Sequence, residues 1–251
     1  MPKYGMVIDL QKCVGCGACG IACKTENNTQ NRTNGQTFNW ADYLIEMKGS
    51  FPNVSYENKP VLCNHCSNAA CVEACPVTPK AMFKSEDNIT MHSEERCIGC
   101  RACQIACPYS AVDVEQEDAQ YSVISFNDFS DETHPFYKNN EALIKNGTST
   151  GAEIAAAVGN ELPYRTRYTV NDCSDLRAQG VVEKCLFCPH RVHNGDDPYC
   201  VESCPSGARV FGDLDDPSSE VSRLLRNHRG TVLKPEEGTD PNVYYIRAFK
   251  P

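Results

Sequence analysis

The cysteines of this chain are spaced for iron–sulfur chemistry. Sixteen of the seventeen fall into four groups of four. The third group, Cys97-x2-Cys100-x2-Cys103-x3-Cys107-Pro108, has the C-x2-C-x2-C-x3-C-P spacing of bacterial ferredoxins. The other groups are Cys13-x2-Cys16-x2-Cys19-x3-Cys23, Cys63-x2-Cys66-x4-Cys71-x3-Cys75-Pro76 and Cys185-x2-Cys188-x11-Cys200-x3-Cys204-Pro205. Four complete groups predict four [4Fe–4S] clusters.

The fourth cysteine of each run has a separate role. Three closely spaced thiolates can surround one cluster, whereas the cysteine three residues further on opens a short helix and faces away from it. In two-cluster ferredoxins that last cysteine ligates the other cluster of the pair. The groups are therefore expected to exchange their fourth ligands.

Two other uses of cysteine were weighed. A zinc site would take two separated Cys-x2-Cys pairs, whereas a third and a fourth cysteine follow close behind each pair here. A secreted disulfide scaffold is normally shorter than about 100 residues and lacks Cys-x2-Cys-x2-Cys runs. Both alternatives are less favoured than iron–sulfur clusters.

Composition narrows the class of protein. The chain has 251 residues and 41% hydrophobic content, which is ordinary for a soluble globular protein. No run of 18 apolar residues occurs, so no membrane segment of its own is expected. The start, MPKYGMVIDLQKC, has neither an apolar stretch nor a twin-arginine pair, so no export signal is expected. A net charge of −9 makes nucleic acid a poor candidate partner.

The order of the groups predicts an α+β fold with two ferredoxin-like two-cluster modules. Residues 58–115 form one module around groups two and three, which are separated by a strand-like run at Asn88–His92. If groups one and four pair, residues 1–57 plus 181–215 form the other module from the two ends of the chain. The clusters would then replace much of the hydrophobic core, and metal binding would supply folding energy.

Two segments lie outside these modules. Residues 112–180 form a long polar insertion that is expected to dock a partner, with one helical stretch at Glu153–Val158 ended by Gly159. Residues 216–251 form an extension with a helix and a strand. Asp216 is expected to be the N-cap and Pro217 the first helical residue, with an apolar stripe at Val221, Leu224, Leu225 and His228. The strand is expected at Asn242–Arg247.

With these motifs the chain resembles the four-cluster iron–sulfur subunits of molybdopterin enzymes of the dimethyl sulfoxide reductase superfamily. Within that family it is most similar to the branch of arsenate respiratory reductase, anaerobic arsenite oxidase, and polysulfide, thiosulfate and tetrathionate reductases. The resemblance covers nearly the whole chain except the insertion. It is carried by Gly5-Met6-Val7-Ile8-Asp9, Lys24-Thr25-Glu26-Asn27-Asn28, Leu62-Cys63-Asn64-His65-Cys66, Gly212-Asp213-Leu214-Asp215-Asp216-Pro217 and the Leu-Lys-Pro-Glu…Val-Tyr-Tyr-Ile ending.

The resemblance implies the ligands of four [4Fe–4S] clusters arranged in a row. The first cluster, nearest the catalytic subunit, takes Cys13, Cys16, Cys19 and Cys204. The second takes Cys185, Cys188, Cys200 and Cys23. The third takes Cys63, Cys66, Cys71 and Cys107, and the fourth takes Cys97, Cys100, Cys103 and Cys75. Some relatives have tryptophan at the position of Cys100 and hold a three-iron cluster, so Cys100 favours four complete cubes here.

A few other residues carry weaker predictions. His65 either donates a hydrogen bond to a cluster sulfur or packs under its loop. Lys24 is a cation beside Cys23. His190 and His193 do not have the spacing of a Rieske site and are not counted as ligands. Cys173 is left over, and a free thiol without a role is favoured.

The expected function is electron transfer without catalysis by this chain. The resemblance implies a large molybdopterin catalytic subunit as partner, with molybdopterin only in that chain, and a membrane quinol-oxidising subunit or a cytochrome at the other end. It also implies a periplasmic location, reached by export in the folded state with the partner; a cytoplasmic location is the alternative. A stand-alone polyferredoxin and an electron-transfer subunit of a formate dehydrogenase or hydrogenase remain as alternative functions.

Overall fold

The computed structural model describes residues 1–27, 29, 40–110, 121–127, 142, 144–158 and 180–247 as a mixture of short helices and short strands. In chain order the elements are β1 (Tyr4–Asp9), α1 (Ala18–Asn27), β2 (Ala41–Ser50), β3 (Asn53–Leu62), α2 (Ala70–Glu73), β4 (Met82–Lys84), β5 (Thr90–His92), α3 (Ala102–Ala106), β6 (Ser125–Phe126), α4 (Gly151–Val158), β7 (Val182–Glu183), α5 (Pro189–Val192), α6 (Tyr199–Glu202), β8 (Arg209–Asp213), α7 (Glu220–Asn227), the 3₁₀ turn η2 (Pro235–Glu237) and β9 (Val243–Ile246). This mixture confirms the α+β class.

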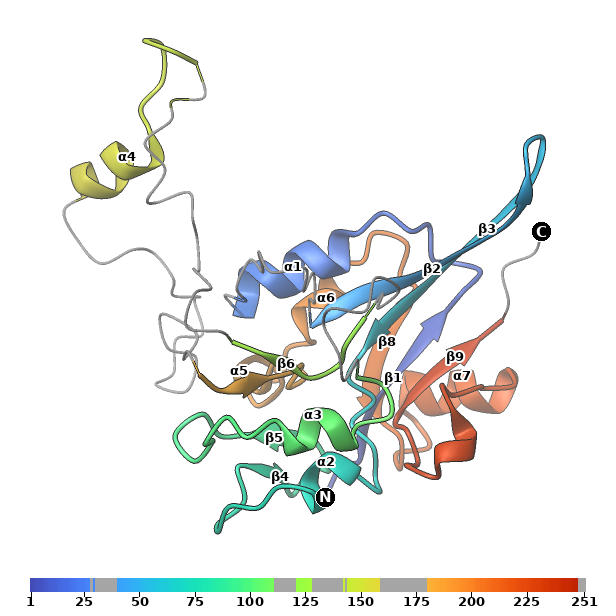
Figure 1. Cartoon of the computed structure of the whole chain (residues 1–251). Coiled ribbons are helices and arrows are strands. Elements are labelled where there is room, and N and C mark those ends of the chain that lie inside the picture. The colour runs from blue at the N-terminus through green and yellow to red at the C-terminus, as the bar shows by residue number, and fades with distance from the viewer. Residues whose placement is uncertain are drawn as a thin grey trace.

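The two ends of the chain meet in one three-stranded sheet with the order β8-β1-β9 (Figure 1). Strand β1 pairs antiparallel with β8, with Tyr4 opposite Asp213, and parallel with β9, with Met6 opposite Val243. As the central strand it is covered on both faces, and its residues Met6, Val7 and Ile8 are fully buried. The sheet therefore holds residues near position 5 beside residues near positions 212 and 243.

Helix α7 covers one side of this sheet, packing on β8 and β1. Val7, Val221 and Ile246 form a second, small core there, and Leu224 and Leu225 pack against it. The predicted apolar stripe is thus confirmed for its first three members, whereas His228 is the C-cap residue.

The predicted start of this helix was wrong. Helix α7 begins at Glu220 with Ser219 as N-cap, whose hydroxyl accepts a hydrogen bond from the Ser222 N–H at 3.2 Å. Asp216 instead accepts from the Ser218 N–H at 2.7 Å, which closes a turn before the helix. An aspartate that bonds the amide two residues ahead competes with helix capping, and here the local turn is preferred.

Three antiparallel hairpins complete the described strands. The longest, β2–β3, projects from the rest of the molecule (Figure 1). Its tip requires Gly49, which has φ +90° and where an added Cβ would lie 2.1 Å from the Asn53 carbonyl oxygen. The β4–β5 hairpin contains the predicted strand at Asn88–His92, which is confirmed for Thr90–His92. The third hairpin, β6–β7, joins Ser125 to Glu183.

Cysteine side chains form a large part of the main core. Among its buried members are Cys19, Cys23, Cys63, Cys103, Cys107, Cys185 and Cys200, together with Met6, Ile8, Trp40, Leu62, Ile124 and Phe187. The core therefore runs through the places where the clusters are expected.

Much of the predicted insertion at 112–180 lies outside the described residues, as do Gly159 and Cys173. The helical stretch predicted at Glu153–Val158 is confirmed, because α4 spans Gly151–Val158. Within the described part of the chain, no helix is both long enough and apolar enough to cross a membrane.

The core beneath α7 generates a stability prediction. Val221→Ala removes two buried methyl groups and is expected to destabilise the sheet locally by about 1.5–3 kcal/mol. Hydrogen exchange of the β1 and β9 amides would then accelerate about tenfold or more, at tenfold per 1.4 kcal/mol. The control is Arg223→Ala on the exposed face of α7, which loses only a surface ion pair to Glu220. Equal exchange rates in both variants would contradict the assigned core.

Candidate metal centres

The first set of thiols converges between the β1–α1 loop and the end of α6. They belong to Cys13, Cys16, Cys19 and Cys204, which line one cavity of about 320 Å³. The loop begins with the Cys13 N–H donating to the Asp9 carbonyl at 3.1 Å, and it turns through Gly15 and Gly17, at φ +65° and +77°. Cys16 is exposed, so this set lies near the surface.

The second set is wholly buried. It consists of Cys23 from α1 together with Cys185, Cys188 and Cys200. Helix α1 packs on α6, which carries Cys200. The Asn27 side-chain amide lies 3.6 Å from the sulfurs of both Cys23 and Cys188, and so connects ligands that are far apart in sequence. Burial is the main cause that raises the pKa of the Cys23 thiol, and the other three thiols raise it further.

The third set lies between the loop after β3 and the end of α3. Its members Cys63, Cys66, Cys71 and Cys107 line a cavity of about 350 Å³. Lys184 and Thr239 also line this cavity. Segments from three distant parts of the chain therefore enclose it.

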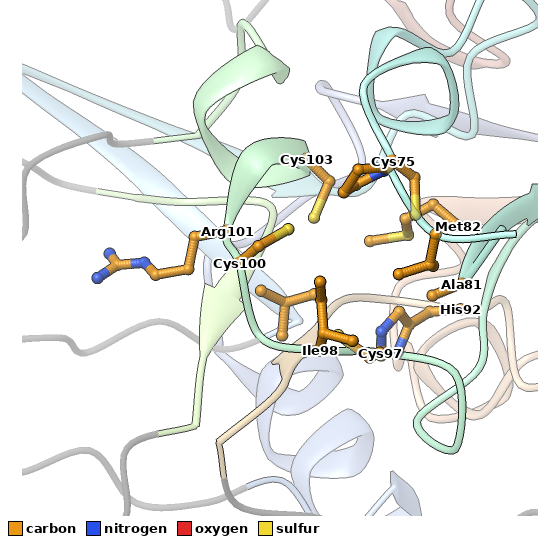
Figure 2. A pocket seen from close by; sticks show the side chains of 12 residues that line it. Cys75, Ala81, Met82, His92, Cys97, Ile98, Cys100, Arg101 and Cys103 are labelled. Atoms are coloured by element: carbon orange, nitrogen blue, oxygen red, sulfur yellow. The ribbon is translucent and has the colours of Figure 1, made fainter.

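The fourth set lies between the loop after α2 and the start of α3. Its members Cys75, Cys97, Cys100 and Cys103 line a cavity of about 290 Å³. Figure 2 shows Cys75, Cys100 and Cys103 directed toward the cavity and Arg101 directed away from it. Gly99 is required in this loop, since it has φ +68° and a Cβ there would lie 2.1 Å from the Gly180 carbonyl oxygen.

The structure thus brings the sixteen cysteines together in the four sets that the resemblance implies, with the fourth cysteines exchanged. Cys204 joins the first set and Cys23 the second, while Cys107 joins the third and Cys75 the fourth. Among the described residues, no three His, Cys, Asp or Glu side chains are grouped as they would be around a single metal ion. Four thiols around a cavity are the donor set of a [4Fe–4S] cube, so the residues fit that group.

The sets also form a row. Burial is the main cause of the raised pKa of Cys200, Cys185 and Cys103, and in each case a thiol of a neighbouring set raises it too. Cys19 of the first set acts on Cys200 of the second. Cys63 of the third acts on Cys185 of the second, and Cys71 of the third acts on Cys103 of the fourth. Neighbouring sets are therefore electrostatically close in the order one, two, three, four.

Burial keeps these thiols protonated when no metal is bound. Desolvation is the main cause that raises the pKa of Cys66 and Cys71 to about 11, and that of Cys103 and Cys107 to about 12. A cationic metal core removes this penalty because it binds the thiolate form and releases the protons. Assembly of the clusters and ordering of the core are thus coupled.

Two cysteines differ from the rest. Burial raises the pKa of Cys75 and Cys204, but backbone N–H groups at their helix ends and, for Cys204, the Ser206 hydroxyl outweigh it, so both values are lowered. The Ala208 N–H, for example, donates to the Cys204 sulfur at 3.3 Å. These exchanged ligands therefore face their partner sets with thiolate-stabilising amides.

His65 lies at the junction between the second and third sets. Its ring is fully buried and stacks on Phe187, with centroids 3.6 Å apart. Both residues directly precede the second cysteine of a Cys-x2-Cys pair, and both have positive φ. Nδ1 accepts from the Thr90 N–H at 3.2 Å, and Nε2 has no partner among the described groups. Of the two predictions for His65, packing under the loop is the one observed.

Two lysines flank the same junction. The ammonium of Lys84 donates to the carbonyls of Cys66 at 3.0 Å and His65 at 3.3 Å. Lys184 is almost completely buried and donates to the Cys185 carbonyl at 2.7 Å. Desolvation is the main cause that lowers the pKa of Lys84 to about 8. The carbonyl contacts hold these side chains beside the third set.

The other histidines bind carboxylates. His190 Nε2 lies 2.9 Å from Glu26 Oε1, and His193 Nε2 lies 3.2 Å from Asp87 Oδ2. These contacts agree with leaving both out of the ligand sets. Lys24 lies half-buried in the last turn of α1.

Several residues around the sets were missed from the sequence. The Tyr43 hydroxyl lies 3.0 Å from the Cys19 sulfur, and Arg209 lines the first cavity. Asn27 had a readable signal, since it follows Cys23 by four residues on one helix. Lys184 had one too, as the residue directly before Cys185. Tyr43 and Arg209 reach the sets only through strand pairing, which the sequence does not specify.

Comparison with known proteins agrees with this geometry. The family model described as a 4Fe–4S dicluster domain matches residues 54–125 and 137–214. The arsenate respiratory reductase iron–sulfur subunit ArrB of Shewanella sp. (strain ANA-3) is 43% identical, over 98% of this chain and 97% of that protein. One of the selenate reductase subunits of Mesobacillus selenatarsenatis is 35% identical and one of the tetrathionate reductase subunits of Salmonella typhimurium is 34% identical, each over 97% of this chain and 72% of the relative. The chain therefore belongs to the family of four-cluster iron–sulfur subunits that serve molybdopterin enzymes of the dimethyl sulfoxide reductase superfamily.

Proposed function

We propose that this chain is an electron-transfer subunit carrying four [4Fe–4S] clusters. It passes electrons between a large molybdopterin catalytic subunit and a quinone-linked or cytochrome partner. The observation that carries the proposal is the row of four thiol sets, with each set close to the next. Bound clusters supply one-electron oxidation and reduction, while the protein holds them in sequence and excludes water from the inner ones.

Arsenate or arsenite is the favoured substrate of the catalytic partner, and sulfur compounds come next. The support is similarity alone, because the arsenate respiratory reductase subunit matches over 98% of this chain at 43% identity. A stand-alone polyferredoxin and a formate dehydrogenase or hydrogenase subunit are the alternatives. Both would carry the same clusters, so the partner that copurifies distinguishes them.

The proposed modules follow from the exchanged ligands. One ferredoxin-like module comprises residues 1–57 plus 181–215, and its support is the pairing of β1 with β8. The other comprises residues 58–115. Residues 112–180 are the insertion, proposed to dock a partner, and 216–251 are the extension that carries α7 and β9.

The surface beside the first cavity is suited to the catalytic partner. The projecting β2–β3 hairpin has one apolar face, because directly paired residues share a face of the ribbon. Its members are Tyr43, Ile45, Met47, Val54, Tyr56 and Pro60. Tyr43 and Pro60 line the first cavity, and Met47 and Val14 are 71% and 69% exposed. This apolar face therefore leads from solvent to the mouth of the first set, where an electron would cross.

The first prediction concerns metal content. Anaerobically purified chain is expected to contain about sixteen irons and about sixteen sulfides, because four complete sets are present. Chemical iron and sulfide analysis with metal mass spectrometry measures this. About twelve irons, or zinc in stoichiometric amounts, would contradict four [4Fe–4S] clusters.

Exchange of ligands is tested by a matched pair of variants. Cys107→Ser is expected to damage the cluster of Cys63, Cys66 and Cys71, because its sulfur faces that cavity. Cys75→Ser is expected to damage the cluster of Cys97, Cys100 and Cys103 instead. Electron paramagnetic resonance during redox titration separates the two signals. If each variant perturbed the cluster of its own sequence neighbours, the exchange would be refuted.

The hairpin and the location are tested together. Met47→Glu places a charge on the apolar face and is expected to reduce copurification of the catalytic subunit at least tenfold. Ser55→Glu adds the same charge to the opposite face and should leave the complex intact. Since export in the folded state with the partner is proposed, fractionation should find Met47→Glu protein in the cytoplasm and Ser55→Glu protein in the periplasm.

Equal copurification of the two hairpin variants would reject the hairpin as the docking element. Unbound Met47→Glu protein in the periplasm would reject export with the partner. A chain that copurifies with no larger subunit would favour the polyferredoxin.

A further inference from the structure

Arg209 lies buried between the first and second thiol sets. It begins β8 opposite Ile8 of β1 and is 3% exposed. Its side chain lines the first cavity together with Cys13, Cys16, Cys19 and Cys204. Its Nη1 also lies 3.9 Å from the sulfur of Cys200, a member of the second set. One guanidinium thus faces both sets.

The charge of this guanidinium has no carboxylate partner in the part of the chain that the structure describes. Nη1 contacts the Met6 sulfur at 3.8 Å, and the buried Nη2 lacks a hydrogen-bond acceptor among the described residues. Tyr43 and Tyr245 are its other polar neighbours, and burial raises the pKa of both phenols, so they stay neutral. An arginine cannot lose its proton in a protein. A buried cation left in this way would be strongly destabilising.

The thiols are the groups that compensate it. The guanidinium lowers the pKa of Cys13 in the first set and of Cys23 and Cys200 in the second, against the larger effect of burial. The third and fourth cavities are not lined by Arg209 and are flanked by other cations, such as Lys184. The charge therefore belongs to one neighbouring pair of sets.

We propose that Arg209 is the shared counter-cation of the first and second clusters and raises the reduction potential of both. The proposal rests on the function proposed above, because it requires clusters in both sets. An electron that leaves one cluster oxidises it and reduces the other, with no bond made or broken. Because the cation faces both sites, the added negative charge is stabilised before and after the transfer. Arg209 is thus a positioning residue for charge.

Arg209→Gln in the full-length holoprotein tests this directly. Redox titration followed by electron paramagnetic resonance would resolve the four clusters, with Cys204→Ser and Cys23→Ser identifying the first and second signals. At a fixed ambient potential, the reduced-to-oxidised ratio of both clusters is expected to fall at least tenfold, or about 59 mV for a one-electron couple. The third and fourth clusters should change much less, since Coulomb interaction weakens with distance.

The control is Arg223→Gln, which removes an exposed arginine from α7 and should leave all four potentials unchanged. Unchanged first and second potentials in Arg209→Gln, with full iron content, would overturn the proposal. A shift in only one of them would show that the cation is not shared. Low iron in Cys204→Ser and Cys23→Ser with intact potentials elsewhere would leave the proposed function standing in either case.

Arg209→Lys covers the possibility that the glutamine variant does not load clusters. A single ammonium cannot face both sets as the forked guanidinium does. This variant is therefore expected to lower one of the two potentials more than the other, by at least threefold in the reduced-to-oxidised ratio. Two potentials equal to those of the wild type would overturn the proposal.

Discussion

The exchange of one cysteine between neighbouring sets is the constraint on which the rest of the structure depends. Cys204 must reach the thiols that follow β1, and Cys23 must reach those around α5 and α6. Both requirements are met only if residues near 210 lie beside residues near 6. The β1–β8 pairing provides this, and β9 closes the same sheet. Strand pairing and ligand exchange therefore stabilise each other.

The same constraint explains an unusual core. Seven cysteines are buried among the apolar side chains, and burial raises the pKa of most of them. Without metal, the sets would be neutral thiols around cavities of about 290–350 Å³. Such cavities cost packing energy, and filling them with a bound cluster recovers it while fixing the loops. Fold and cofactor are thus one thermodynamic unit.

Buried cations balance the negative charge that clusters bring. Lys84 and Lys184 border the third set, and Arg209 separates the first from the second. Two of them are anchored by carbonyl groups and one by sulfur atoms. Their placement at the boundaries between sets means that they act on pairs of neighbouring sites, which suits a protein whose task is to move charge along a row.

The sequence by itself determined the chemistry, the number of sets and the rule of ligand exchange, because cysteine spacing is a local property of the chain. It also predicted the strand at β5, the stripe on α7 and the helix α4, which depend on local periodicity. It failed at the start of α7, where Asp216 closes a turn instead of capping the helix. Only the tertiary structure decided which groups surround the sets. Tyr43, Arg209 and the stack of His65 on Phe187 come together through pairings between residues far apart in sequence, and no local pattern encodes such contacts.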